Sequence, residues 1–380
     1  MKTNVQEEIE TGIEEYATSG KGTGGRTKMV PEDFIVTEVL MDDSKKLILK
    51  RGSGGYPLYV LCKWNSGTIE ARERIQWRSG IAVNTLGLKD KRALTFQFVS
   101  CRKKVEGAPQ VIKEDAFRAT LVAESVRPLK KVDLLGNFFR IRIHSFGGSA
   151  SDVDRAGELL DEGGLPNYFG SQRFGRDKPN QRVGEAIVKR KFSAAAKILF
   201  DQEMGEPEAI VALRKVPISI RRLLVQSYQS YLFNRSLSSV LAANGALSRE
   251  SAMYILKSEG RPIVLERYLR DPSEAPSGFV PVPLGQLPGF AFRNRHDSYS
   301  VALTEVMEEE GLIAKDFFIK EMQELSVEGG YRPACMVGWY KGHLLEKEST
   351  EVRLGLYSGC YATMFLRELM KPSDPTSSGL

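Results

Sequence analysis

The chain has 380 residues, of which 42% are hydrophobic and 9% aromatic. This content is enough for sizeable cores and excludes wholesale disorder. The formal net charge of +6 permits a polyanionic partner without requiring one. The sequence has no run of 18 apolar residues, and its N-terminus lacks the apolar core of a signal peptide. We therefore expect no membrane partner and a cytoplasmic location.

The residues that most often bind metals or form nucleophilic triads are sparse. The four cysteines lie far apart, and the three histidines show no spacing typical of a metal site. Reduced thiols and no dedicated metal site are expected. No Gly-x-Ser-x-Gly motif occurs, so serine–histidine catalysis is not favoured either.

The first part of the chain is rich in strands. Residues 1–24 combine a Glu-rich stretch with small residues and predict a mobile leader. A helix is expected over 69–80, ended by Gly80. Alternating apolar residues predict strands at 34–40, 56–64, 94–101 and 134–144.

The middle of the chain is mainly helical, and strands return near its end. Helices are predicted at 151–162, 183–192, 193–202, 206–213, 219–242, 302–326 and 362–370. Five prolines between Asp271 and Gly289 predict a loop. Strands are expected at 334–339 and 352–356, and the tail 372–380 is expected to be disordered. This order predicts an α/β (α+β) domain interrupted by a mainly helical insertion.

One charged connection, Gly87–Gln97, carries a candidate catalytic carboxylate. Asp90 is flanked by Lys89, Lys91 and Arg92, and these cations favour its ionised form. An ionised Asp is a usable nucleophile or charge stabiliser. A solvated turn, with Asp90 as a capping residue, explains the same pattern.

Two further stretches carry candidate binding residues. On the strand 134–144, Asn137 and Phe139 share one face by alternation, whereas two arginines lie on the other. The segment 164–177 mixes glycines, aromatic residues and arginines, which suits close approach to bases and phosphates as well as a packed loop.

Five stretches, in this order along the chain, resemble the TruD family of tRNA pseudouridine synthases. They are Lys28–Phe34, Gly87–Gln97, Asn137–Arg140, Pro166–Gly175 and Tyr361–Leu369. The resemblance implies a pseudouridine synthase catalytic domain (25–163 plus 331–371, mixed or antiparallel sheet) and a TRUD insertion domain (164–330), with a cleft for RNA between them. It also implies conversion of uridine to pseudouridine at position 13 in the D arm of tRNA, without cofactor or metal, by a protein that we expect to be a monomer.

The resemblance also implies roles for single residues. Asp90 would be the nucleophile, acting on the ribose or the base, or would deprotonate the sugar. Lys28 would hold Asp90 ionised, Phe139 would pack on the target base, and Asn137 would organise the loop that carries Asp90. The remaining substrate-binding candidates are Lys89, Gln97, Asn167, Phe169, Gln172 and Arg173.

Two other functions stay open on the sequence alone. An RNA-binding module without chemistry would depend on basic clusters such as Lys189-Arg190-Lys191. A glycosidase-like hydrolase would need a second carboxylate near Asp90, for which Glu32 or Asp33 is available.

Overall fold

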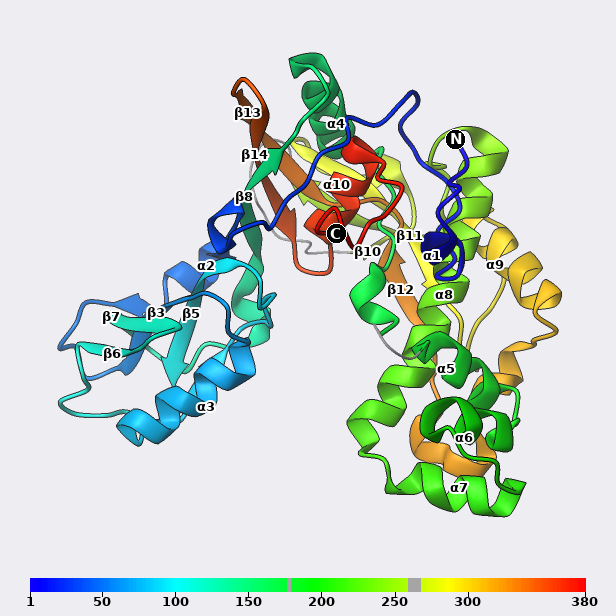
Figure 1. The fold of residues 1–380 in the computed structure, drawn as a ribbon, viewed down its shortest axis with the longest axis horizontal. Coiled ribbons are helices and arrows are strands. Elements are labelled where there is room, and N and C mark those ends of the chain that lie inside the picture. The colour runs from blue at the N-terminus through cyan, green and yellow to red at the C-terminus, as the bar shows by residue number, and fades with distance from the viewer. Residues whose placement is uncertain (176–178, 259–267) are drawn as a thin grey trace. The chain divides into compact units, whose positions relative to one another are not determined.

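The computed structural model describes residues 1–175, 179–258 and 268–380, which Figure 1 shows as a ribbon. Their contacts divide the chain into two compact units. The first is built on Met1–Gly20, Gly163–Leu256 and the described part of Glu266–Met336, and the second on Lys21–Glu162 and Val337–Leu380. Each unit thus combines segments that are far apart in the sequence.

The second unit contains a mixed sheet. Its strands are β1 (Phe34–Leu40), β2 (Ile48–Leu49), β3 (Tyr56–Lys63), β4 (Val83–Thr85), β5 (Leu94–Cys101), β6 (Val111–Glu114), β7 (Phe117–Ser125), β8 (Leu134–His144), β13 (Gly338–Leu345) and β14 (Ser349–Tyr357). The order is β13-β14-β8-β1-β5-β3-β7-β2, with β4 paired to β5 and β6 to β7. β1 and β5 run parallel, and the neighbouring pairs run antiparallel. This confirms the predicted mixed α/β class.

Helices α2 (Asp42–Lys45), α3 (Thr68–Ser79), α4 (Ala150–Glu162) and α10 (Ala362–Met370) belong to the same unit, with 3₁₀ turns η1 (Pro31–Asp33) and η2 (Lys131–Asp133). α3 buries Ala71 and Ile75 in a core with the sheet residue Leu61, and Gly80 ends it at φ 70°. α4 packs on β13 so closely that a Cβ at Gly157 would come within 2.4 Å of the Tyr340 ring.

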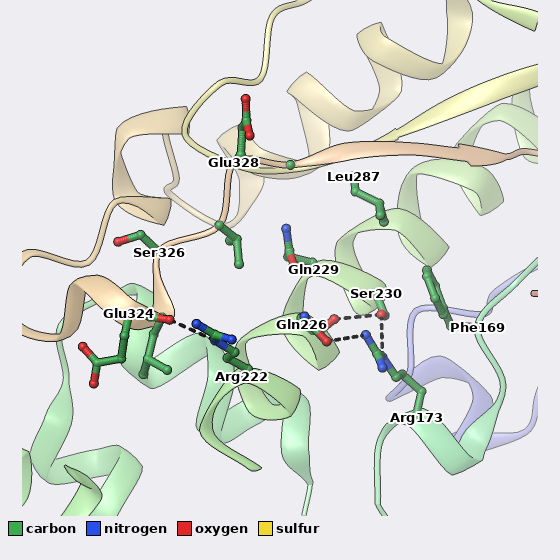
Figure 2. A pocket seen from close by; sticks show the side chains of 13 residues that line it. Phe169, Arg173, Arg222, Gln226, Gln229, Ser230, Leu287, Glu324, Ser326 and Glu328 are labelled. Carbon is green, nitrogen blue, oxygen red and sulfur yellow. Dashed lines mark hydrogen bonds between the residues drawn. The ribbon is translucent and has the colours of Figure 1, made fainter. Parts of the chain in front are cut away.

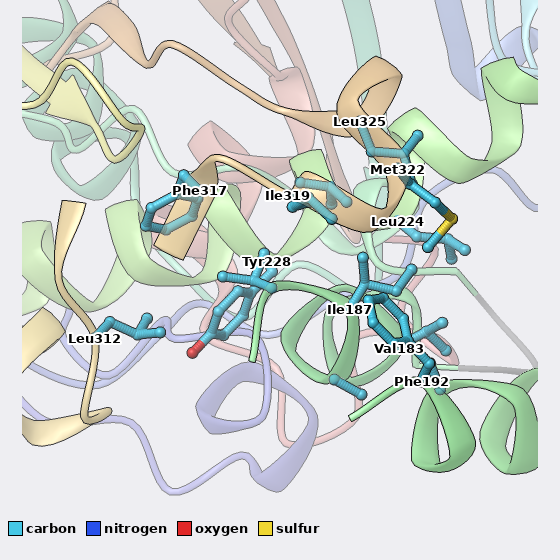
Figure 3. Close-up of a cluster of buried hydrophobic side chains, with 14 of the residues drawn as sticks. Val183, Ile187, Phe192, Leu224, Tyr228, Leu312, Phe317, Ile319, Met322 and Leu325 are labelled. Atoms are coloured by element: carbon cyan, nitrogen blue, oxygen red, sulfur yellow. The ribbon is translucent and has the colours of Figure 1, made fainter. Parts of the chain in front are cut away.

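The first unit surrounds one long helix. Its elements are α1 (Gln6–Ile9), α5 (Asn180–Val188), α6 (Phe192–Phe200), α7 (Glu206–Lys215), α8 (Ile218–Asn244), α9 (Ser298–Glu309), 3₁₀ turns η3 (Ser171–Arg173), η4 (Pro272–Glu274), η5 (Ala314–Phe317) and η6 (Lys320–Leu325), and strands β9 (Tyr254–Ser258), β10 (Tyr268–Leu269), β11 (Phe279–Leu287) and β12 (Gly330–Pro333). Figure 3 shows the core in which Leu224 and Tyr228 of α8 meet Val183, Phe317 and Met322.

None of the described helices is both long and apolar enough to cross a membrane. The 27-residue α8 is the longest, and it carries Arg221, Arg222 and Arg235.

The leader (1–24) and the tail (372–380) were both expected to be mobile, but in the structure both contact the rest of the protein. In the leader, Ile13 and Tyr16 are buried, and Glu14 N–H donates to Ser238 Oγ at 3.0 Å. The leader was expected to be mobile because of its glutamates and its run of small residues, but Glu8 is buried and accepts from Thr3 Oγ1 at 2.6 Å. In the tail, the Ser378 carbonyl accepts from Thr27 N–H at 3.1 Å.

Two predictions for the region 271–339 were also wrong. The proline-rich stretch 271–289 contains the strand β11, whose Pro283 carbonyl accepts from Ala334 N–H at 2.9 Å. Proline lacks a donor but keeps its acceptor, so it can occupy strand positions that need no N–H. The strand expected from Ala334 begins at Gly338.

Asn234 of α8 ties the leader to the segment that precedes η3. Its Oδ1 accepts from Phe169 N–H at 2.8 Å, and its Nδ2 donates to the carbonyls of Thr11 at 2.9 Å and Phe169 at 3.0 Å. Asn234→Ala leaves these backbone groups unsatisfied, so the free energy of unfolding should fall by about 3 kcal/mol in urea denaturation. Ser239→Ala, an exposed change on the same helix, should cost less than about 0.5 kcal/mol; equal losses would contradict the role of Asn234.

Candidate active site

The candidate site is built on one face of four neighbouring strands, β8-β1-β5-β3. Because side chains alternate along a strand, cross-strand partners share a face. The register pairs Glu38 with Asn137 and Val36 with Phe139. It also pairs Val36 with Thr95, and Thr95 with Lys63. One face therefore gathers two aromatic rings, Phe34 and Phe139, with the polar groups Glu38, Thr95, Gln97, Lys63 and Asn137.

Buried polar groups on this face fasten the connection that carries Asp90. Gln97 is fully buried; its Nε2 donates to the Gly87 carbonyl at 3.0 Å, and its Oε1 accepts from Thr68 Oγ1 at 3.1 Å. Thr68 Oγ1 in turn accepts from Lys89 N–H at 3.0 Å. Since buried polar groups are costly when unpaired, these bonds define the path of residues 87–90.

Asp90 forms an ion pair with Lys28. Lys28 Nζ lies 3.0 Å from Asp90 Oδ2, and the exposed fractions of the two side chains are 6% and 25%. Asp90 Oδ1 accepts from Arg92 N–H at 3.1 Å. Burial by itself would raise the pKa of Asp90, but the Lys28 ammonium, the Arg92 N–H and Lys63 hold that pKa below its ordinary value. Asp90 is therefore a carboxylate at neutral pH.

The position of Lys28 depends on an unusual backbone. Its φ is 57°, a left-handed value that is uncommon for residues other than glycine. Its ammonium lies 4.6 Å from the centroid of Phe34, and the Phe34 and Phe139 rings meet edge to face at 5.9 Å. Phe139 is thus linked to Asp90 through two intermediate side chains.

A second buried ion pair supports the same connection. Lys89 Nζ lies 2.6 Å from Glu38 Oε1, and both side chains are almost fully buried. Glu38 Oε2 also accepts from Phe98 N–H at 2.8 Å. Burial raises the pKa of Glu38, and Lys89 opposes that rise. Lys89 and Gln97, predicted as substrate-binding residues, thus make their hydrogen bonds within the protein.

Asn137 does not contact the Asp90 connection through any hydrogen bond of the described residues. Its Oδ1 is buried and accepts no hydrogen bond within the described part of the chain. Its nearest link to the site is its strand partner Glu38, whose carboxylate holds Lys89. Asn137 can therefore influence the loop that carries Asp90 only through its strand partner Glu38.

Sequence reasoning missed Lys63. This fully buried residue donates from Nζ to the carbonyls of Ser66 at 2.8 Å and Asp90 at 3.0 Å. Burial lowers the pKa of Lys63 to about 8, against the attraction of Asp90. Lys63 is the last residue of β3, and nothing in the local sequence indicates that its side chain is buried. Glu38 and Thr68 were missed for a similar reason, since their partners lie on other elements.

The remaining predicted residues lie in the first unit. Asn167 is buried and exchanges hydrogen bonds with the Pro333 carbonyl and the Arg332 guanidinium. Phe169 packs edge to face on Phe233 at 5.6 Å, with Arg332 3.9 Å from its centroid. Gln172 is exposed. Arg173 donates to Ser230 and Gln226 of α8. The end of this segment, Arg176 and Asp177, lies outside the described residues.

Three of the residues that the alternative functions would use, Asp33, Lys189 and Arg190, have partners elsewhere in the protein. Asp33 accepts from Met29 N–H and Val30 N–H and lies 2.8 Å from His144 Nε2. In the basic cluster, Lys189 pairs with Glu185 and Glu310. Arg190 donates to the carbonyls of Val188, Asp316 and Phe318. Across the described ranges, no three His, Cys, Asp or Glu residues form a group that could hold a metal ion.

Comparison with known proteins places nearly the whole chain in one family. The family model for tRNA pseudouridine synthase D (TruD) matches residues 10–211 and 202–369. Relatives named "Probable tRNA pseudouridine synthase D" include one from Thermococcus sibiricus, 30% identical over 94% of this chain and 97% of the relative. Another, from Pyrococcus furiosus, is 28% identical over 94% and 98%. A crystal structure of a protein from Methanosarcina mazei described as tRNA pseudouridine synthase D (TruD) has a TM-score of 0.76 and 23% identity to this chain, covering 98% of this chain and 99% of that one.

Lys28→Met should raise the pKa of Asp90. Burial raises this pKa, and the Lys28 ammonium is the strongest of the contacts that lower it, so the pKa should rise when the ammonium is removed. The titration of ¹³C-labelled Asp carboxyl groups by NMR measures it. Lys91→Met removes an exposed lysine next to Asp90 in sequence and should change the pKa by less than half as much. Equal shifts in both variants would contradict the ion pair.

Lys63→Met should change how stability depends on pH. In the folded protein the pKa of Lys63 is about 8 against 10.5 for the free side chain, so the unfolded chain binds more protons between these values. The free energy of unfolding of the wild type, relative to the variant, should therefore rise by up to about 3 kcal/mol as the pH increases from 8 to 10.5. Urea denaturation at several pH values measures this, with the exposed Lys113→Met as a control that should show no such slope.

Proposed function

Because the chain belongs to the tRNA pseudouridine synthase D (TruD) family, we propose that it converts uridine to pseudouridine at position 13 in the D arm of tRNA, with Asp90 as the nucleophile. Membership of the family makes the protein a pseudouridine synthase, an isomerase that acts on tRNA. The position in the tRNA and the role of Asp90 are the parts that we propose.

The observation that carries the proposal is the partly buried pair of Asp90 and Lys28. An ionised carboxylate, placed by hydrogen bonds from Lys28 and the Arg92 backbone, suits attack on an electrophilic carbon or removal of a proton. It is a poor proton donor, since its pKa lies below the ordinary value. The same geometry is compatible with attack on ribose, attack on the base, or deprotonation of the sugar.

The reaction is an isomerisation. The bond between ribose and the base nitrogen breaks, the base turns, and a bond from ribose to a base carbon forms, so nothing is exchanged with a co-reactant. The enzyme must hold the detached base meanwhile, and a base pulled from its stack is commonly held against an aromatic ring. We propose that Phe139 performs this role, supported on its edge by Phe34.

The other residues divide into positioning and binding groups. Lys28, Lys63 and Gln97 bond to Asp90 or to its loop, and Lys89, within that loop, pairs with Glu38. We propose that they position the nucleophile, with Asn137 acting through its partner Glu38. Gln172 is exposed and Arg173 half-buried, whereas the other two candidates of this segment, Asn167 and Phe169, are buried; Gln172 and Arg173 are therefore proposed to contact RNA. Independence of a cofactor and a monomeric state stay predictions.

Asp90→Asn should bind tRNA with affinity near that of the wild type and form no detectable pseudouridine, because the substituted amide cannot act as a nucleophile. Chemical mapping of pseudouridine in a tRNA transcript measures the product, and filter binding measures the affinity. Asp115→Asn, which changes an exposed carboxylate of the same unit, should retain full activity.

Each alternative function gives a different result in that experiment. Full activity of Asp90→Asn would remove Asp90 from the mechanism. Release of free uracil by the wild type would indicate a hydrolase. If the wild type binds tRNA but forms neither pseudouridine nor free uracil, the protein is an RNA-binding module without chemistry.

A further inference from the structure

The first unit contains a pocket, and one of its lining residues is Arg173, which is already proposed to contact RNA. It has a volume of about 560 Å³, within the range of sites that hold small ligands. Its walls come from the segment before α5, from α8, from the end of β11 and from Glu324–Gly329. No residue of the Lys28–Asp90 site lines it.

One wall is a polar stripe along α8. Arg222, Gln226, Gln229 and Ser230 recur at helical spacing and line the pocket. The guanidinium of Arg173 lies against this stripe, donating to Ser230 Oγ at 3.3 Å and to Gln226 Oε1 at 3.1 Å (Figure 2). These bonds orient a flat cation before any ligand arrives, which lowers the entropy lost on binding.

Arg222 supplies a second cation. Its Nε donates to the Glu324 carbonyl at 3.2 Å, and among the described residues no carboxylate lies within ion-pair distance of it. The Glu324 carboxylate pairs instead with Arg221. Figure 2 shows the Glu324 and Glu328 carboxylates turned to the margins of the pocket. Arg222 and Arg173 are therefore the two lining cations that an anionic group in the pocket can meet.

The remaining lining is apolar. Phe169, Leu287, Leu325 and Val327 line the same pocket as the two arginines. Flat ligands with one anionic group match such a combination: apolar side chains cover the ring, the Gln226 amide meets its polar edge, and a guanidinium binds phosphate. Nucleotides have this chemistry.

We propose that this pocket binds one nucleotide of the tRNA, distinct from the uridine that reacts, with its phosphate on Arg222 and its base between the α8 stripe and the apolar wall. The inference rests on the proposed function for the identity of the RNA. It assigns the first unit a role in recognising the substrate by a single nucleotide held out of the stack.

The test uses the full-length protein with Asp90→Asn, so that tRNA stays unchanged during binding. Arg222→Ala should weaken binding of a tRNA transcript about tenfold. It should also lower the slope of log affinity against log salt by about one, as expected when one phosphate contact is lost. The matched control is Arg214→Ala, since Arg214 is also exposed and donates to a carbonyl of η6, that of Glu321. The control should bind within twofold of the parent protein.

A second variant tests the base. Gln226→Glu keeps an oxygen for Arg173 but removes the amide donor and adds a negative charge, so it should weaken tRNA binding at least fivefold. Gln323→Glu makes the same change at an exposed position outside the pocket and should have little effect. If Arg222→Ala weakens binding but Gln226→Glu does not, the site is a phosphate contact only, and the nucleotide proposal is overturned.

The two proposals fail separately. Pseudouridine formation by the wild type, with tRNA binding by Arg222→Ala equal to that by Arg214→Ala, overturns the pocket and leaves the reaction intact. Absence of pseudouridine with a selective loss of binding in Arg222→Ala and Gln226→Glu overturns the reaction, and supports the pocket as an RNA site.

Discussion

The ion pair between Lys28 and Asp90 is the constraint on which the site depends. A carboxylate and an ammonium that are largely removed from water are stable only when each has a partner and further hydrogen bonds. The Arg92 backbone and Phe34 provide those additional contacts. The left-handed backbone of Lys28 is then understandable as local strain that the surrounding contacts outweigh.

The sheet supplies what this pair requires. Strands β8, β1, β5 and β3 are neighbours although they come from separate parts of the chain, and their alternation brings Glu38, Lys63 and Gln97 to one face. Each of these buried polar side chains bonds to the connection 87–90. Loss of one would leave its partners unsatisfied. The loop that carries Asp90 therefore depends on the sheet beneath it for its conformation.

The first unit uses polar residues in two different ways. Asn167 and Asn234 are buried and satisfy backbone groups, so they hold segments together. Arg173, Arg222 and Gln226 line a pocket, where their polar groups can meet a ligand. The same helix α8 serves both purposes, because its buried side builds the core around Leu224 and Tyr228 while another side of it lines the pocket.

Local sequence determined most of the elements. Alternation predicted β1, β5 and β8, and helical periodicity predicted α3, α4, α8 and α10, because these patterns reflect which side of each element is buried. The charged residues around it indicated Asp90 as a candidate carboxylate, and resemblance to a family added Lys28 as its partner. Only the tertiary structure showed that Lys63 and Glu38 contact the loop of Asp90. It also showed that the leader packs on α8 and that the proline-rich stretch contains the strand β11. The physical reason is distance along the chain: Lys28 and Asp90 are 62 residues apart, and Glu38 and Lys89 are 51 apart, so no local pattern encodes their pairing.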